Sequence, residues 1–334
     1  MSLIPMPPYP WFQSTWSNLV DRFNQQTMPH ALLFSGPEGL GALELAQSLS
    51  QLMLCQTPID DVACHRCRSC QLLSAGTHPD LFMALPEGVG KQIKIDQVRA
   101  ITQFIANTAS QGGKKIIVIS PVESLNHNAS NALLKSLEEP AGDTVIILIT
   151  EQESLLLPTI KSRCMRFIMR PPSFDVAQKW LIDEGCSDQV YLLPEADNAP
   201  LKVKTWVSEG YPQKRTLVMQ ALGDVGLKLL GPVQALSNIN IEPRVLCDVI
   251  LLLVESQITY KMAPKSLRAQ QLAALADADS KIDQVLSSVP VTILMRYRDR
   301  LNEQKKQLLI NPNLNTTLFN EQVMMDWSAI TMQR

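Results

Sequence analysis

The sequence predicts an α/β domain built on a parallel sheet, followed by two helical domains. Three observations support this prediction. Between about residues 30 and 170, short apolar runs alternate with helix-like segments, and a strand–helix–strand repeat implies a parallel sheet with helices on both faces. After "RPPS" (170–173) the strand-like runs end. From there to the C-terminus the spacing of the apolar residues is helical.

The elements of the α/β domain follow in order along the chain. Strands are expected at five apolar runs, 31–34, 81–85, 116–119, 145–149 and 167–169. Helices are expected at four segments between them, 42–54, 96–107, 130–139 and 154–162.

The helical remainder is clearest in "VLCDVILLLVE" (245–255). Its apolar residues recur at i, i+3, i+4 and i+7, as in Leu246, Val249, Ile250 and Leu253, which is the spacing of one buried helix face. Pro171-Pro172 and the stretch 194–212, which contains Pro, Gly and Asn, are the candidate domain boundaries.

Composition narrows the functional classes. The 334 residues carry 30 basic and 32 acidic side chains, for a net charge of -2, so bulk charge does not indicate a nucleic-acid or membrane-surface binder. "MSLIPMPPYPW" lacks the pattern of a secretory signal. The apolar run 245–254 is interrupted by Asp248 and is too short to span a bilayer. We therefore expect a cytoplasmic protein with no membrane partner.

The stretch "SGPEGLGAL" (35–43) has the glycine frame of a phosphate-binding P-loop, with Gly36, Gly39 and Gly41 between an apolar run and a helix. A working P-loop then needs a Lys for the β and γ phosphates and a Ser or Thr for magnesium. Ala42 and Leu43 occupy those positions and can do neither. An ordinary strand-to-helix turn that needs glycine would produce the same frame.

The second half of an ATP site is an acidic pair at the end of a later strand, for magnesium and for the attacking water. In "KKIIVISPVES" the expected place is taken by Ser120-Pro121. Both halves lack their charged groups, so we expect a degenerate nucleotide fold that does not hydrolyse ATP.

Four of the seven cysteines lie within sixteen residues. Cys55, Cys64, Cys67 and Cys70 form the pattern C-x8-C-x2-C-x2-C, whose short gaps let thiolates converge on one ion and form a closed tetrahedral zinc site. An iron–sulfur cluster and unligated thiols remain alternatives, although no Cys-Pro follows at the x3 position, where Ser74 stands. With no open position for water, the expected role of the metal is structural.

"NALLKSLEEP" (131–140), an apolar strand ending in Thr150, and "LLPTIKSRC" (156–164) together resemble the clamp-loader branch of the AAA+ ATPases. The cysteine cluster, together with a P-loop frame that lacks its Lys and its Ser or Thr, narrows the resemblance to the bacterial delta-prime family. It extends along essentially the whole chain and is specific through residue 170. Thr150 matches the sensor of that family, and as a strand-end residue it is also suited to capping the strand.

The resemblance implies an AAA+ fold with three domains. They are a RecA-like domain (1–168) with a zinc-binding insertion near 55–70, a small helical lid (169–210), and an all-α oligomerisation collar (211–334). In "EADNAPLKVKTW" (195–206) no arginine stands where the sensor of the second domain is expected.

The resemblance also implies a role for Ser162, Arg163 and Cys164, which match the motif that presents an arginine finger to the ATP site of a neighbouring subunit. The chain would be a non-catalytic stator that binds structural Zn²⁺ but no ATP. It is not expected to be an enzyme on its own, but part of an ATPase complex within the DNA polymerase III holoenzyme. Its implied partners are delta and tau/gamma subunits, with the sliding clamp and primed DNA reached through the complex.

Other functional classes remain open from the sequence. Arg163 is also compatible with a surface salt bridge. The chain could be a self-sufficient P-loop ATPase with a divergent loop. It could instead be a zinc-dependent nucleic-acid-binding protein, with Arg66 and Arg68 beside the cysteines, although its near-neutral charge argues against that class.

Overall fold

A computed structural model describes residues 7–86, 93, 95–111, 113–125, 127–138, 140, 142–237, 239–263, 280–310 and 314–332. The chain divides into two compact units, residues 1–183 with 197–202, and residues 184–196 with 203–334. The domain limits expected after residues 168 and 210 stay predictions.

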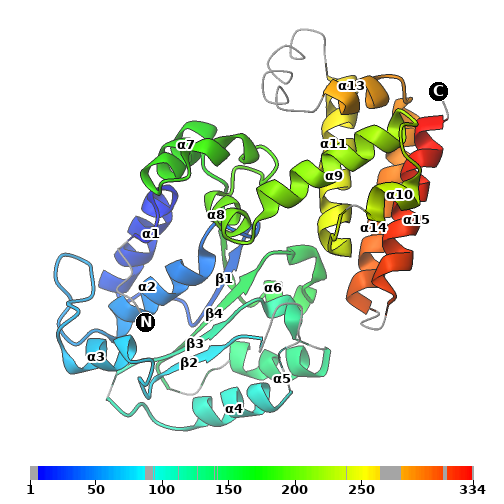
Figure 1. The fold of residues 1–334 in the computed structure, drawn as a ribbon. Coiled ribbons are helices and arrows are strands. Elements are labelled where there is room, and N and C mark those ends of the chain that lie inside the picture. Colours follow the sequence, from blue (N-terminus) through cyan, green and yellow to red (C-terminus); the bar gives the residue numbers. More distant parts are fainter. Residues whose placement is uncertain are drawn as a thin grey trace. The chain divides into compact units, whose positions relative to one another are not determined.

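The first unit contains a parallel five-stranded sheet (Figure 1). Its strands are β1 (Ala31–Ser35), β2 (Leu81–Ala84), β3 (Lys115–Ile119), β4 (Thr144–Thr150) and β5 (Met165–Ile168). The strand order is β2-β3-β4-β1-β5, and every neighbouring pair is parallel. The predicted α/β fold class is confirmed.

The three central strands, β1, β3 and β4, are buried along their whole length, as expected for apolar strands covered on both faces. Alternate residues point to two separate cores. Leu32 and Phe34 of β1 join a core that includes α1 (Gln13–Asn24) and α2 (Ala42–Leu54). Leu33 joins the core of the opposite face, with α4 (Ile95–Ala106) and α5 (His127–Glu138).

Three of the four predicted helices match α2, α4 and α5, the first of them residue for residue. The fourth prediction, one helix over 154–162, is wrong. The chain forms a 3-10 turn (Glu153–Leu155) and then α6 (Pro158–Lys161). Proline fixes the backbone for the first turn of a helix but pushes the preceding residue out of the helical region, and Leu157 has the extended ψ of 135°.

The remaining elements include helices that the sequence analysis did not place. The other described helices are α3 (Arg68–Ser74), α7 (Phe174–Asp183), α8 (Pro200–Ser208), α9 (Tyr211–Gly226), α10 (Pro232–Ser237), α11 (Pro243–Met262), α13 (Ser280–Ser287), α14 (Val291–Ile310) and α15 (Thr316–Met332). Short 3-10 turns occur at Pro10–Phe12, Val122–Ser124 and Ser187–Leu192. Among the described residues, no helix has the length and apolarity needed to cross a membrane.

The second unit has its own helical core. Leu246, Val249, Ile250 and Leu253 of α11 are all buried, which confirms the helix face predicted from their spacing. Trp327 of α15 is fully buried, and its indole N–H donates a hydrogen bond to the Leu222 carbonyl of α9 at 3.0 Å. A buried indole of this kind needs such a partner.

Candidate functional site

The predicted phosphate loop, residues 36–41, joins the carboxyl end of β1 to the start of α2. Gly39 and Gly41 have φ angles of +82° and +88°, in the left-handed region that glycine adopts without steric cost. Gly41 is the residue that precedes the first turn of α2. The loop therefore has the strand–glycine–helix geometry that the sequence predicts.

The chain's own residues cover this loop. A Cβ added to Gly41 would lie closer than 3.0 Å to the Tyr9 ring, and one added to Gly39 would lie equally close to Lys202. A Cβ on Gly36 would meet the Met169 carbonyl oxygen. The three glycines are thus required by close packing within this chain, whatever the loop binds.

Two hydrogen bonds hold the cover in place. The Trp11 indole N–H donates to the Leu40 carbonyl at 2.9 Å, and the Leu201 N–H donates to the Gly39 carbonyl at 3.2 Å. The Tyr9 and Trp11 rings stack with their centroids 4.9 Å apart. Leu40 is fully buried beneath them, so an aromatic and apolar layer lies directly on the loop.

The side chains after the loop belong to the same apolar layer. Ala42 and Leu43 are half-buried against the core that contains α1 and α2. At the end of β3, Ser120 and Pro121 stand where the acidic pair would be needed. Neither position therefore supplies a cation for phosphate or a carboxylate for magnesium.

Glu123, the first acidic residue after that strand along the chain, accepts hydrogen bonds from the backbone. Oε1 of Glu123 accepts hydrogen bonds from the N–H groups of Glu151 and Gln152, at 2.9 and 3.1 Å. Thr150 Oγ1 also accepts from the Gln152 N–H, at 3.2 Å. Both side chains therefore stabilise the turn that follows β4. The role of Glu123 is not visible from sequence, because its partners lie 28 and 29 residues away.

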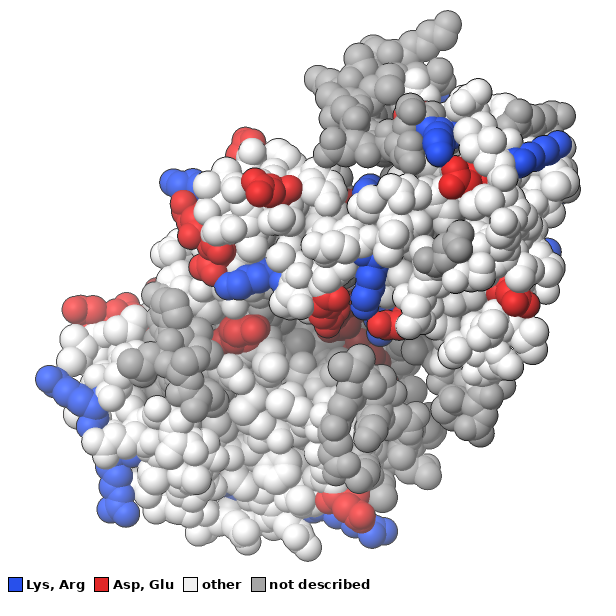
Figure 2. All heavy atoms as spheres, viewed as in Figure 1, with Lys and Arg blue, Asp and Glu red and all other residues white. Residues whose placement is uncertain are grey.

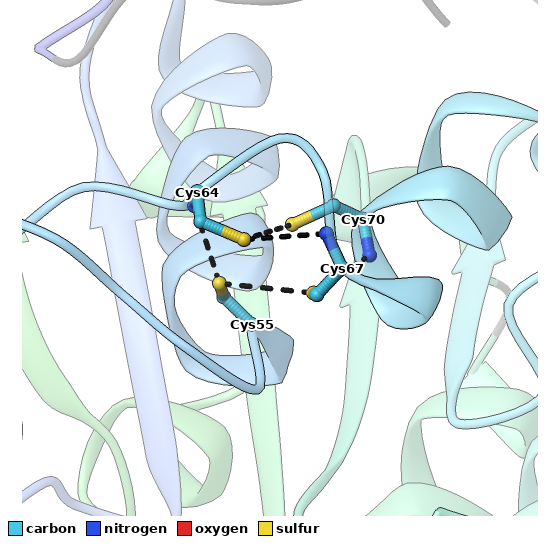
Figure 3. A group of neighbouring side chains, drawn as sticks. All are labelled: Cys55, Cys64, Cys67 and Cys70. Atoms are coloured by element: carbon cyan, nitrogen blue, oxygen red, sulfur yellow. Dashed lines mark hydrogen bonds between the residues drawn. The ribbon is translucent and has the colours of Figure 1, made fainter.

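The four predicted metal ligands converge (Figure 3). The Sγ atoms of Cys55, Cys64, Cys67 and Cys70 all lie within 4.8 Å of one another. The pairs Cys55–Cys67 and Cys64–Cys70 are 4.0 Å apart. A tetrahedral zinc with sulfur ligands at about 2.3 Å requires sulfur–sulfur distances of about 3.8 Å, so this cluster could hold a metal ion with little rearrangement.

Backbone and side-chain donors point at the sulfur atoms. The N–H groups of Cys64, Cys67 and Cys70 each donate to a cluster sulfur at 3.2 to 3.4 Å. Hydrogen bonds, first that of the Thr57 hydroxyl at 3.2 Å, lower the pKa of the Cys64 thiol to about 5. Burial raises the pKa of Cys70. At Cys67, burial is outweighed by hydrogen bonds from the backbone and from Cys70, and the pKa of this thiol is also lowered. Since a coordinated thiol is deprotonated outright, two of the four positions, Cys64 and Cys67, are already shifted toward the thiolate.

A buried polar network, which the sequence analysis missed, connects the cysteine module to the sheet. The Ser69 hydroxyl donates to the Leu54 carbonyl at 2.6 Å and lies 2.8 Å from His78 Nε2. His78 Nδ1 accepts from the Asp80 N–H, and the Asp80 carboxylate accepts from the N–H groups of Ser110 and Gln111. All three polar side chains are buried and bonded, so the network is structural.

Arg163 lies just after α6 and is held by two elements. Its Nε and Nη2 donate to Glu138 Oε1 at the end of α5, the Nε bond being 2.7 Å long. Nη1 donates to the Thr159 carbonyl at 2.9 Å. The arginine side chain is 31% exposed. Ser162 is exposed, whereas Cys164 packs against the α4–α5 core and burial raises its pKa to about 11.

Comparison with known proteins supports one family. The family described as "DNA polymerase III, delta subunit" matches residues 12–173. The chain is 35% identical over 331 residues to the DNA polymerase III subunit delta' of Pseudomonas aeruginosa, covering 96% of this chain and 98% of that relative. The chain belongs to the DNA polymerase III delta' subunit family.

Two further matches extend the comparison. The delta' subunit of Escherichia coli is 37% identical over 185 residues, which is 55% of each chain. A solved structure of a DNA polymerase III gamma subunit-related protein from Thermotoga maritima covers 94% of this chain and 99% of its own, with 18% identity and a TM-score of 0.43. The motif-based assignment to the delta-prime family is confirmed.

Proposed function

We propose that this delta' family member is a non-catalytic stator subunit of the bacterial replicative clamp loader. It would assist the ATP-driven loading of the sliding clamp onto primed DNA. Its chemical contribution would be one guanidinium, that of Arg163, presented to the ATP site of a neighbouring subunit.

The observation that carries the proposal is the presentation of Arg163. The guanidinium lies at the surface after a one-turn helix and is oriented by hydrogen bonds. An arginine is always charged, and its planar fork matches phosphate oxygens. Supplied in trans, such a group accelerates hydrolysis by about 10³ to 10⁵. A half-exposed salt bridge alone contributes only about 0 to 1 kcal/mol to stability.

We further propose that this subunit binds no ATP at its own loop. Tyr9, Trp11 and Lys202 pack closely against the loop. The side chains at 42 and 43 are apolar, and no acid stands at 120 or 121. These features favour a scaffold role over the alternative of a self-sufficient ATPase.

The proposed assembly is a cytoplasmic hetero-oligomer with delta and tau/gamma subunits, in which the helical second unit would supply the collar. The four cysteines would hold a structural zinc ion, which would fix the insertion between α2 and β2.

On the face drawn in Figure 2, basic and acidic side chains are interspersed over a largely uncharged described surface. The described residues on this face form no basic patch of the kind that a free-standing nucleic-acid binder needs.

The decisive experiment compares wild type with Arg163→Ala in the reconstituted clamp loader. ATPase stimulated by clamp and primed DNA is measured, and assembly is checked by size exclusion. The site that receives Arg163 is expected to lose roughly 10³-fold in rate, so the stimulated rate falls steeply while the complex stays intact.

Arg166→Ala is the matched control. Arg166 lies three residues later and is ion-paired with Glu153, so its loss removes the same charge without touching Arg163. A wild-type rate in the assembled Arg163→Ala complex would reject the finger and leave the subunit a purely architectural role.

A further inference from the structure

We infer that Glu138 is a positioning residue for Arg163, an assignment that rests on the proposed function. Glu138 belongs to the "LEEP" stretch (137–140) at the end of α5. It lies 25 residues before Arg163 in the chain. The inference is that its carboxylate fixes the direction in which the guanidinium faces the neighbouring subunit.

The hydrogen bonds define which edge of the guanidinium is used inside the chain. Nε and Nη2 form its side edge, and both donate to the same Oε1 of Glu138. Nη1 donates through one of its two N–H groups to the Thr159 carbonyl at 2.9 Å. Three of the five N–H donors are thus engaged.

The two remaining donors are one on Nη1 and one on Nη2. In a planar guanidinium, Nη1 and Nη2 together form the end-on fork, which points away from the stem of the side chain. Among the described residues, neither of these two donors has a hydrogen-bond partner. An end-on fork binds two oxygens of a carboxylate or phosphate at once, so the contacts with Glu138 and Thr159 leave the phosphate-binding edge available.

Both partners of the pair stand on well-anchored backbone. Leu137, next to Glu138, is fully buried and belongs to the same apolar core as Ile160 of α6. His30 Nε2 lies 2.9 Å from the Leu137 carbonyl, which ties the end of α5 to the start of β1. The Arg163 N–H donates to the Ile160 carbonyl. The orientation of the guanidinium is therefore set by fixed elements.

The pair is expected to contribute little to folding stability. The Arg163 and Glu138 side chains are 31% and 51% exposed, and ion pairs of this exposure contribute little to stability. Orientation is different, because a small misplacement of a catalytic group can lower a rate by up to about 10²-fold. Removal of the carboxylate should therefore alter the rate while fold and assembly stay unchanged.

The test uses the reconstituted clamp loader with four versions of this chain: wild type, Glu138→Gln, Arg163→Ala, and the double variant. Steady-state kcat and KM for ATP are measured with clamp and primed DNA. Glu138→Gln is expected to lower kcat by roughly tenfold with unchanged KM, assembly and melting temperature. The double variant should be no slower than Arg163→Ala, because Glu138 acts only through Arg163.

Asp143→Asn is the control. It removes the carboxylate of the Lys114–Asp143 ion pair, whose side chains are 31% and 59% exposed, closely matching the pair under test. This variant should retain the wild-type kcat.

Each alternative result has a distinct meaning. A normal kcat in Glu138→Gln, with a slow Arg163→Ala, would overturn the positioning role and leave the finger intact. A faster Glu138→Gln would overturn it in favour of competition between Glu138 and the phosphate. A normal rate in Arg163→Ala would overturn the proposed function, and the positioning role with it.

Discussion

The cysteine cluster and the glycine loop both carry the sequence pattern of a binding site, yet the two regions differ in what the pattern retains. In the cluster, all four ligand atoms are present and lie within 4.8 Å of one another. In the loop only the backbone shape is present, with Gly39 and Gly41 at positive φ. Ala42 and Leu43 follow the loop, and neither of these side chains can bind phosphate or magnesium.

The difference shows which structural feature each kind of sequence motif specifies. Cysteine spacing specifies the ligand atoms themselves, so convergence of the four sulfurs shows a cluster that could hold a metal ion. A glycine frame specifies a backbone conformation, which a strand-to-helix turn requires with or without a nucleotide. Here Tyr9 and Lys202 fill the space beside the glycines, so the glycines are needed for close packing within this chain.

The largest effect is expected from removing the metal ligands. Cys67→Ser should reduce the zinc content of the purified chain from about one per molecule to near zero. A structural zinc site of this type contributes on the order of 10 kcal/mol to folding of its module. Metal analysis measures the loss of zinc, and hydrogen exchange over residues 55–74 measures the loss of stability of the module.

Cys186→Ser provides the control, since Cys186 is a buried thiol outside the cluster and should leave the zinc content unchanged. Absence of metal from wild-type protein purified with zinc in the medium would contradict this prediction. The cysteine cluster would then resemble the glycine loop, because it would have the sequence pattern of a binding site but no bound ligand.

A smaller effect is expected from filling the space beside the loop. Gly41→Ala forces a left-handed alanine into the Tyr9 ring, at a cost of about 2 to 5 kcal/mol in the free energy of unfolding. Gly76→Ala has a similar φ of +70° but no atom within 4 Å, so it should cost only about 1 to 2 kcal/mol. Urea denaturation followed by tryptophan fluorescence compares them.

Equal losses in the free energy of unfolding for the two variants would mean that the Tyr9 ring moves aside easily to make room for a methyl group. The loop would then be open to ligands, and the contrast with the cysteine cluster would weaken.

Sequence reasoning succeeded where the signal is local. The start of α2 at Ala42 follows from the glycines that precede it, and the cysteine cluster follows from two-residue gaps. The break within the helix expected at 154–162 also has a local signal, because Pro158 disfavours the helical conformation at Leu157.

Contacts across long separations carry no such signal. Lys202 covers Gly39 from more than 160 residues away, and Glu138 meets Arg163 across 25 residues. The hydrogen-bond network of His78 likewise joins separate segments, and the spacing of its polar residues in the sequence does not indicate that they interact. These contacts depend on which elements the sheet brings together, and only the fold reveals them.

The smallest effect is expected from restoring the missing side chains of the loop. In the double variant Ala42→Lys, Leu43→Thr, the P-loop pattern is complete, but Trp11 still bonds the Leu40 carbonyl and Tyr9 still lies on Gly41. No acid stands at 120–121 to support magnesium. Calorimetry with magnesium-ATP should therefore detect no binding tighter than about 1 mM, a free energy of about -4 kcal/mol. Micromolar binding would mean that the two side chains alone had silenced the loop, and that its aromatic cover is no barrier to nucleotide.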